Sequence, residues 1–413
     1  MKFPTIPVRF KFVTLCILSG LFTALFVAMD VYYQGTILSD PIVYGFLTEV
    51  IGLAITFLIM LFLVVPYKKK PVGKFLDPTF KKFIIPRGKL LYYLMGAGLS
   101  AAFSTLAYFA LTAITDPSTV IPFSKLVIVY LLVAELLHDR DTPTIVEVLS
   151  ITMIITGLFV MAVYRSEFDL ISILIVLGPY NLGSMFYTYF QKLARSLPTR
   201  TTHNDSLNLR FWSLFFLTLF QTLMSLPFIT FEQWQIILSF ITDTFTVVFI
   251  TINMSFAFFA YVFYIRALGM GKMSIVNALT SVSVIFGIVF TIIGNIYFPE
   301  AFGPLSSSAI FWSLQVTGAI LVLEGIVALS ITQERAYLLI KLKYPCTYGV
   351  LDKIIKVKGV TRAAFITGHY AIIARLQIRS IAKVYNTIVR EIEAMPEIEK
   401  VVTMTIIKEW SKI

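Results

Sequence analysis

The sequence predicts an all-α polytopic membrane protein of ten transmembrane helices, followed by a small α+β cytoplasmic domain. Of its 413 residues, 58% are hydrophobic and only 14% are charged, whereas a typical soluble domain has about 25% charged residues. The mean hydropathy is +0.85, and the apolar residues gather in long runs, as in helices that face lipid. Beyond residue 333 these runs stop and charged residues become frequent. The predicted partner of the long first part is the lipid bilayer.

Ten apolar runs are each near the roughly 20 residues that a helix needs to cross the hydrocarbon core. They cover residues 10–33, 41–65, 90–114, 118–137, 144–163, 169–190, 209–230, 244–268, 274–297 and 306–330. Turn residues separate them, among them Asp40-Pro41, Asp116-Pro117 and Phe298-Pro299. Proline and aspartate favour turns over helix interiors, so these pairs predict where one helix ends and the next begins.

Basic residues between the spans predict the orientation of the helices. With a cytoplasmic N-terminus, the inner loops and helix ends hold Lys2, Arg9, Lys11, Lys68, Lys69, Lys70, Lys74, Lys81, Lys82, Arg87, Lys89, Arg140, Lys192, Arg195, Arg200, Arg210, Arg266 and Lys272. The outer loops then contain Arg165 and no other basic residue. Lysine and arginine collect in cytoplasmic loops. We therefore expect a multi-pass protein of the cell membrane with both termini in the cytoplasm, and the net charge of +11 needs no nucleic-acid partner.

Two short motifs recur in the second half of the apolar part. Ile155-Thr156-Gly157 in the fifth span matches Val316-Thr317-Gly318 in the tenth, and Tyr108–Leu111 at the end of the third span matches Ile265–Leu268 in the eighth. Because five spans per half is an odd number, the two copies must have opposite topology, as in many secondary transporters. The predicted units are 1–165 and 166–332 for the two repeats and 333–413 for the soluble domain.

The stretch Ala101–Leu137 contains an Ala-Leu pair at the end of one helix, then a Pro-containing helix that ends in a glutamate. The matching residues are Ala110-Leu111, Pro122 and Glu135, with Ala267-Leu268 and Glu300 in the second half, where no proline occupies the ninth span. This pattern resembles the EamA-like proteins of the drug/metabolite transporter superfamily over residues 10–330. The resemblance implies ten helices, an inverted five-plus-five repeat, and a permease that exports or exchanges small metabolites.

The C-terminal part alternates between strand and helix patterns. The predicted elements are strand Ala336–Tyr344, helix Tyr348–Val357, strands Val360–Thr367 and Ala371–Ile378, a helix from Ser380 to Met395, and strand Val401–Lys408. The third strand alternates apolar with polar residues, which is typical of a half-buried strand. The order β-α-β-β-α-β is that of a ferredoxin-like domain.

Within this domain, Thr367, Gly368 and Tyr370 form a turn between the two middle strands. The segment Thr361–Glu409, and with it the domain over residues 336–410, resembles the ligand-binding domain of the Lrp/AsnC regulators. In that family a Thr-Gly-x-Tyr-Asp turn joins the two middle strands. Ala371 replaces the aspartate of that turn. The resemblance implies an amino-acid ligand at the tail and a homodimer formed through it. The regulators' helix-turn-helix is absent, so no nucleic-acid partner is expected.

Two ionisable residues lie well inside predicted spans. Charged groups there are costly and mark functional candidates. Glu49 lies nine residues into the second span and Lys125 eight into the fourth, and both spans run inward from the outer face. At about 1.5 Å per residue the two side chains lie at similar depth. Three interpretations remain open for them: a structural ion pair, a substrate site in which Lys125 holds an anionic group and Glu49 an amine, or proton coupling through Glu49.

Other polar groups in mid-span are Asn181, Gln221, Asn253 and Gln315, with Tyr180, Tyr187 and Tyr261 nearby in helical spacing. They either form hydrogen bonds between helices or line a substrate path. We include Asn181, Tyr180, Asn253 and Gln315 in the candidate substrate site. Asn181 is favoured because Pro179 frees backbone carbonyls at that depth. The residues near helix ends, interpreted as interfacial anchors, are Asp30, Glu135, Glu147, Arg266 and Glu324.

No pattern predicts an enzyme, a cofactor or a metal site. The two cysteines, Cys16 and Cys346, do not form a zinc pattern, and His138–Asp141 lies in a short turn without partner spacing. The leading hypothesis is a secondary transporter of small metabolites, such as amino acids, that works by alternating access and carries a cytoplasmic regulatory domain. The alternatives are a membrane-anchored ligand sensor or scaffold, and a lipid or isoprenoid carrier if the cavity is apolar and open to the bilayer.

Overall fold

The computed structural model describes residues 8–68, 70–112, 117–138, 145–163, 174–197, 204–302, 308–331, 334–343, 349–357, 360–367, 370–378 and 390–405. The chain divides into two compact units. The first comprises Met1–Ala134 with Glu147–Ser330, and the second comprises Glu135–Val146 with Ile331–Ile413. Each unit is described by itself below.

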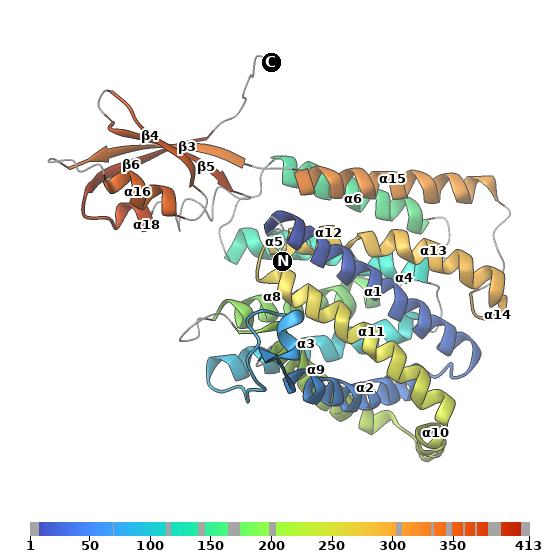
Figure 1. Ribbon diagram of the computed structural model, residues 1–413. Helices are drawn as coiled ribbons and strands as arrows, with labels where there is room; N and C mark the ends of the chain where they lie inside the picture. Colours follow the sequence, from blue (N-terminus) through green and yellow to red (C-terminus); the bar gives the residue numbers. More distant parts are fainter. Residues whose placement is uncertain are drawn as a thin grey trace. The chain divides into compact units, whose positions relative to one another are not determined.

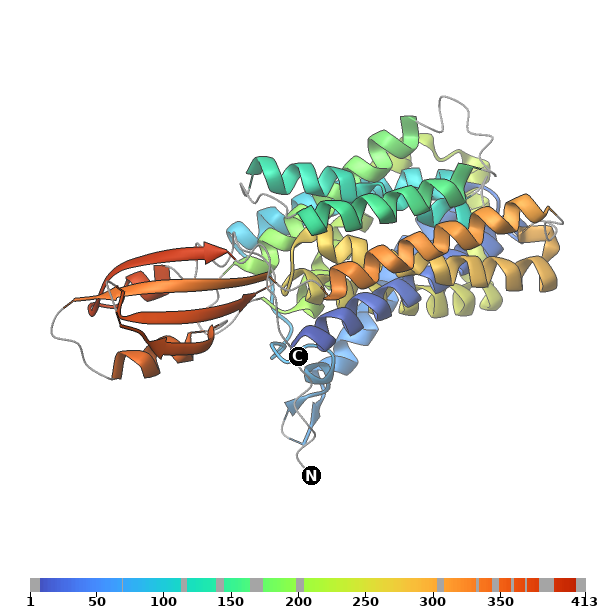
Figure 2. The ribbon, with the colours of Figure 1, turned by 90° about the horizontal axis from the view of Figure 1, so that it is seen from above.

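The first unit is a bundle of helices (Figures 1 and 2). The helices that lie wholly or mostly in this unit are α1 (Val8–Thr36), α2 (Pro41–Val64), α3 (Lys89–Thr112), α4 (Pro117–Ser124), α5 (Val127–His138), α6 (Ile145–Val163), η2 (Val176–Tyr180), α8 (Asn181–Ser196), α9 (Ser206–Ser225), η3 (Leu226–Phe228), α10 (Phe231–Thr242), α11 (Thr244–Leu268), α12 (Met273–Thr280), α13 (Val282–Tyr297), α14 (Pro299–Phe302) and α15 (Ala309–Ile331). The sequence did not predict α10, which lies between the seventh and eighth expected spans.

Seven helices of the described part are long and apolar enough to cross a membrane, which fits a multi-pass membrane protein. They are Phe10–Thr36, Pro41–Val64, Lys89–Thr112, Ser206–Phe228, Thr244–Leu268, Met273–Tyr297 and Ala309–Ala328. The other three predicted runs are shorter or interrupted. The run 118–137 is divided into α4 and α5, the run 144–163 is the 19-residue α6, and the run 169–190 contains η2 before α8.

The interruptions have local causes. Pro122 lies inside α4 and cannot donate a backbone hydrogen bond, and the chain turns at Lys125, whose N–H bonds to the Pro122 carbonyl at 3.0 Å. Gly178 in η2 has non-helical backbone angles next to Pro179. A third break, at Ser281, separates α12 from α13. A run of apolar residues thus predicted a span, but not whether its helix is continuous.

Acidic and hydroxyl side chains cap several helices. Asp40 accepts hydrogen bonds from the N–H groups of Ile42 and Val43 at 2.9 and 3.1 Å, and Pro41 takes the first helical position of α2. Asp243 caps α11 in the same manner. Such caps satisfy N–H groups that have no partner within the helix, so the predicted boundary at Asp40-Pro41 is confirmed.

Close packing through small residues joins the two halves of the bundle. Helix α1 packs along α11, and α3 packs along α8 and α9. Gly157 of α6 and Gly318 of α15 face each other, because a Cβ on either glycine would lie 2.6 Å from the carbonyl oxygen of the other. These two glycines end the tripeptides that recur in the sequence, so the recurring motifs meet in space.

A segment between α2 and α3, residues 66–88, is called the strap here. It contains the short antiparallel strands β1 (Pro66–Tyr67) and β2 (Lys70–Pro71) and the helical turn η1 (Val72–Phe75). The Phe80 side chain is fully buried beside Gly73. The strap therefore has a hydrophobic inner side that packs on the bundle.

The second unit contains a four-stranded antiparallel sheet with the order β4-β5-β3-β6. Its elements are β3 (Glu334–Leu342), α16 (Gly349–Lys356), β4 (Val360–Phe365), β5 (Ile372–Ile378), α18 (Arg390–Glu393) and β6 (Ile398–Thr405). These strands agree with the predicted ones within a few residues. Most of the helix predicted from Ser380 to Met395 lies outside the described residues, and α18 is its described part.

One face of this sheet forms the core of the second unit. Leu338 and Ile340 of β3 and Ile372 and Ala374 of β5 are fully buried with Ile354 of α16. The buried residues alternate along β3 and β5, and the sequence predicted this period-2 pattern for β5.

Candidate functional site

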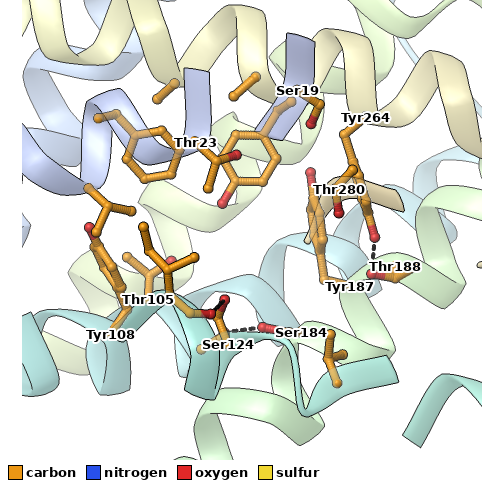
Figure 3. A pocket seen from close by; sticks show the side chains of 18 of the residues that line it. Ser19, Thr23, Thr105, Tyr108, Ser124, Ser184, Tyr187, Thr188, Tyr264 and Thr280 are labelled. Atoms are coloured by element: carbon orange, nitrogen blue, oxygen red, sulfur yellow. Dashed lines mark hydrogen bonds between the residues drawn. The ribbon is translucent and has the colours of Figure 1, made fainter. Parts of the chain in front are cut away.

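A cavity of about 180 Å³ lies within the helical bundle. Hydroxyl and aromatic side chains from several helices surround it (Figure 3), including Ser19, Thr23, Thr105, Tyr108, Ser124, Ser184, Tyr187, Thr188, Tyr264 and Thr280. Thr188 and Tyr264 form a hydrogen bond of 2.7 Å across it. The cavity also contains four ionisable groups, Asp30, Glu49, Lys125 and Arg210.

Asp30 of α1 holds four helices together at the cavity wall. Its carboxylate accepts hydrogen bonds from the Tyr44 hydroxyl of α2 at 2.7 Å, the Tyr108 hydroxyl of α3 at 2.6 Å and the Asn253 amide of α11 at 2.6 Å. Asp30 is 1% exposed. Interpreting it as an interfacial anchor was therefore wrong. A signal was present, because Asp30 is the only acidic residue in the apolar run 10–33.

Glu49 and Lys125, the two ionisable residues singled out from the sequence, both line this cavity. They do not form the ion pair that one interpretation proposed. In the described part of the chain no basic group lies within 4.0 Å of the Glu49 carboxylate, and its Oε2 has no hydrogen-bond partner. Among the described residues, the Lys125 ammonium donates a single long bond of 3.4 Å, to the Thr280 hydroxyl. Both residues are less than 10% exposed, so two buried ionisable groups line the cavity without an ion pair within 4.0 Å among the described residues.

Arg210 is a second cation in the cavity, and the sequence did not single it out as a site residue. It lies in the second turn of α9 and stacks on the Tyr261 ring, with its guanidinium carbon 4.2 Å from the ring centre. Arg210 is 3% exposed, and its Nε has no hydrogen-bond partner among the described residues. Arg210 lies at the predicted start of the seventh span. It was therefore interpreted as one of the basic residues that mark the cytoplasmic side.

Lys125 and Thr280 stand at two helix breaks that face each other. Lys125 lies between α4 and α5, and Thr280 ends α12 directly before the break at Ser281. In the ten-span prediction from the sequence, these breaks lie in the runs counted as four and nine. Interrupted helices in corresponding positions mark the binding site in many transporters.

The other predicted site residues are divided between the cavity and the helix contacts. Tyr180 lines the cavity. Asn181 does not: its amide donates to the carbonyls of Phe123 and Val176 at 2.9 and 2.7 Å, next to the breaks in α4 and η2. Gln315 donates to the Met161 carbonyl at 3.1 Å and joins α15 to α6. Asn253 reaches the cavity only through Asp30. Gln221 is buried with no partner for its amide atoms among the described residues.

In the described part of the bundle, two ion pairs lie at helix ends, away from the cavity. Lys272, before α12, pairs with Glu147 in the first turn of α6 at 3.1 Å, and both side chains are buried. Arg195, near the end of α8, pairs with Asp77 of the strap at 3.1 Å. Glu147 thus forms a buried ion pair between helices instead of an interfacial anchor, whereas Glu324 is exposed on α15.

Asp77 has an unusually complete set of partners. Besides Arg195, it accepts bonds from the Ser206 N–H and hydroxyl at 2.8 and 2.7 Å and from Thr79. Burial by itself would raise the pKa of Asp77, but the Arg195 charge and these hydrogen bonds outweigh burial and hold that pKa below its usual value. Folding thus makes the Asp77 carboxyl a stronger acid.

We expect Asp77→Asn to lower the free energy of unfolding by about 1 kcal/mol at neutral pH, because asparagine keeps the shape and one acceptor oxygen but loses charge-assisted bonds. Since folding lowers the Asp77 pKa, its contribution is complete above the unfolded-state pKa of about 3.9 and is lost as the pH falls through the folded-state value. Unfolding measured against pH in detergent should show this acid-side loss in the wild type and a smaller one in Asp77→Asn. Glu300→Gln, at an exposed residue, is the control; an equal acid-side loss in Asp77→Asn would contradict the assignment.

In the second unit, the predicted ligand turn joins β4 to β5. Thr367 is exposed and Tyr370 is partly buried, and Gly368 lies outside the described residues. The Ile366 N–H bonds to the Ala371 carbonyl at 2.9 Å and closes the turn. Ala371, which stands where the Lrp/AsnC turn has an aspartate, thus contributes its backbone carbonyl to the turn.

Comparison with known proteins bears on this second unit. Residues 335–412 match the model of the Lrp/AsnC ligand binding domain. The C-terminal unit is therefore an Lrp/AsnC-type ligand-binding domain, and the resemblance predicted from the turn is confirmed.

None of the curated proteins matches the chain. A solved structure described as "Crystal structure of protein" is 14% identical, covers 76% of this chain and 95% of its own, and superposes with a TM-score of 0.46. A score that low does not establish a common fold.

Proposed function

We propose that the protein is a secondary transporter that moves a small metabolite through the bundle by alternating access, and that the Lrp/AsnC-type domain regulates it from the cytoplasm. The observation that carries the proposal is the pair Glu49 and Lys125, which are buried in one cavity and not paired with each other. Burying two charges without pairing them is costly. A substrate that brings the missing partners would offset that cost.

The arrangement of the helices supports an EamA-like plan of ten spans in two inverted sets of five. Spans one and eight pack together as α1 and α11, and their counterparts six and three pack as α8 and α3. The corresponding spans four and nine are both interrupted, and the equivalent glycines Gly157 and Gly318 meet. In this plan both termini lie in the cytoplasm, as the distribution of basic residues predicts.

The cavity suits a small molecule with an anionic and a cationic group. Lys125 with Thr280 would bind a carboxylate or similar anion, and Glu49 would bind an amine. A cavity of about 150 Å³ holds benzene, so the volume of about 180 Å³ suits a molecule of amino-acid size. The charged lining argues against the lipid or isoprenoid carrier. Proton coupling is the other role proposed for Glu49, since it lines the cavity and its Oε2 has no hydrogen-bond partner among the described residues.

The second unit supplies the regulatory part of the proposal. Its element order and the strand order β4-β5-β3-β6 support the proposed βαββαβ ferredoxin-like fold. As an Lrp/AsnC-type domain, the second unit would bind an amino acid near Thr367 and Tyr370 and form a homodimer. Ligand binding there would shift the balance of transporter conformations by its differential affinity for them.

A second candidate function is a membrane-anchored ligand sensor or scaffold without transport. The match of residues 335–412 to a ligand-binding domain favours this function. In a sensor, the helices would serve only to hold that domain at the membrane. In that case the cavity charges would have no role in the response to ligand.

Lys125→Ala separates these two functions. We expect at least a roughly tenfold loss of flux, since a charge contact to the substrate is worth about 1.4 kcal/mol or more, while the tail still binds its ligand. The measurement is counterflow in proteoliposomes across the twenty amino acids and common metabolites, with ligand binding to the same full-length protein followed by calorimetry. Lys89→Ala, at an exposed lysine at the start of α3, is the matched control. Wild-type flux in Lys125→Ala, or no counterflow for any compound, would contradict the transporter.

A further inference from the structure

The strap, residues 66–88, must lie at one membrane surface. It begins directly after α2 and ends directly before α3, and both helices are long and apolar enough to cross a bilayer. Figure 2 shows the segment, in light blue, projecting from the end of the bundle beside the N-terminal end of α1. Its two ends are therefore held at the depth where helices leave the hydrocarbon core.

One side of the strap is bonded to the bundle. Asp77 bonds to Arg195 and Ser206, and the Arg266 guanidinium donates to the Leu76 carbonyl. Nearer α3, the Asn208 side chain bonds to the Ile84 N–H at 2.9 Å and to the Lys82 carbonyl at 2.9 Å, and the Trp212 indole N–H bonds to the Ile84 carbonyl at 2.7 Å. These bonds fix the strap on the ends of α8, α9 and α11 and turn its other side outward.

The outward side carries an unbalanced positive charge. The strap contains seven basic residues and one acidic residue, Asp77. Asp77 is buried and paired with Arg195, so it cannot neutralise the lysines at the surface. Lys68, Lys70, Lys82 and Arg87 are described basic residues with exposed side chains.

Large apolar side chains are exposed among these charges. Phe75 is 76% exposed, Tyr67 54% and Ile85 63%, and Tyr92 in the first turn of α3 is 71% exposed. The Lys68 ammonium lies 5.3 Å from the centre of the Tyr67 ring. Aromatic side chains beside lysines are typical of the membrane interface, where the ring enters the headgroup layer and the ammonium meets phosphate.

We infer that the outer side of the strap is a docking surface for anionic phospholipid headgroups. The lysines attract the phosphates, Phe75 and Ile85 insert into the interface, and the bonds of Asp77 and Asn208 hold the surface in place. If the basic residues served only to orient the helices in the membrane, the positive charge would be explained. The exposed aromatic residues on a segment whose other side is firmly packed would not be explained. This inference is independent of the transport proposal.

The test uses the full-length protein in nanodiscs of phosphatidylcholine alone or mixed with phosphatidylglycerol. The readouts are the midpoint of thermal unfolding and the phosphatidylglycerol retained in native mass spectrometry. The variant Lys68→Gln/Lys70→Gln/Lys82→Gln is compared with Lys343→Gln/Lys356→Gln/Lys400→Gln, which removes the same charge from exposed positions of the second unit. Neither set changes the bonds of Asp77 or the cavity.

We expect phosphatidylglycerol to raise the unfolding midpoint of the wild type and of the control variant, and high salt to abolish the rise. The strap variant should bind phosphatidylglycerol about fivefold more weakly per lysine removed, since each contributes about 1 kcal/mol near an anionic surface. Inorganic phosphate added to phosphatidylcholine discs should have no effect, which separates a lipid surface from a free-phosphate site. Equal retention in the two variants, no preference for phosphatidylglycerol in the wild type, or an equal shift with phosphate alone would overturn the inference.

Discussion

Asp30→Ala is expected to lower the free energy of unfolding by about 4 kcal/mol, which is severe for one substitution. The Asp30 carboxylate accepts three hydrogen bonds from Tyr44, Tyr108 and Asn253, on three other helices. Alanine would leave these donors buried without a partner, and each such group costs about 1–3 kcal/mol. Titration of the detergent-solubilised protein with sodium dodecyl sulfate, followed by tryptophan fluorescence, measures the loss.

Two further variants make this result specific. Asp30→Asn keeps the shape and one acceptor, so its loss should be about half as large. Glu324→Ala removes an acidic residue that is exposed on α15, and we expect a change within about 0.5 kcal/mol, as for most surface substitutions. If Asp30→Ala were as stable as Glu324→Ala, the network would not hold the four helices together.

Gly157→Ala and Gly318→Ala are each expected to destabilise the bundle by about 2 kcal/mol, and the double variant by about 3 kcal/mol. A methyl group on either glycine would meet the carbonyl oxygen of the other at 2.6 Å. Backbone atoms cannot move aside as a flexible side chain can, so α6 and α15 must separate. A single separation relieves both clashes, which is why the two effects should not add.

The same unfolding titration measures these effects in a double-mutant cycle. Gly349→Ala, at the start of α16, is the control, because nothing lies within 4 Å of its would-be Cβ. Full additivity of the Gly157 and Gly318 substitutions would show that the two glycines do not share one contact. Losses no greater than that of Gly349→Ala would show that α6 and α15 are not closely packed.

Much of the fold follows from local patterns along the chain. The apolar runs predicted every long helix, the Asp40-Pro41 pair marked the start of α2, and the period-2 alternation located strand β5 of the second unit. These features depend on near neighbours, since a helix or strand is defined by its own periodicity and end residues. The Thr367–Tyr370 turn likewise pointed to the ligand-binding domain that residues 335–412 match.

The interruptions were harder to predict. Pro122 and Pro179 are visible in the sequence, yet proline often lies in a continuous membrane helix when neighbouring helices satisfy the freed backbone groups. Here Asn181 bonds to the carbonyls of Phe123 and Val176, one near each proline. The same contact explains why Asn181 stabilises helix breaks instead of lining the cavity.

The candidate site was predicted in part. Glu49 and Lys125 stood out because ionisable residues are rare in apolar runs, and depth along the helices placed them at one level. Depth does not give rotation about the helix axis or the lateral distance between helices. The sequence could therefore not tell an ion pair from two separate groups, and the structure shows them separate within one cavity.

The sequence by itself determined the membrane character, the helical periodicity and the two-part organisation of this protein, because each depends on composition or on neighbours along the chain. Only the tertiary structure decided which polar groups meet. Asp30 became the centre of a four-helix network, Arg210 entered the cavity, and Asp77 fixed the strap because side chains distant in sequence satisfy one another's buried hydrogen bonds and charges. That pairing depends on how the helices pack, and no local pattern records it.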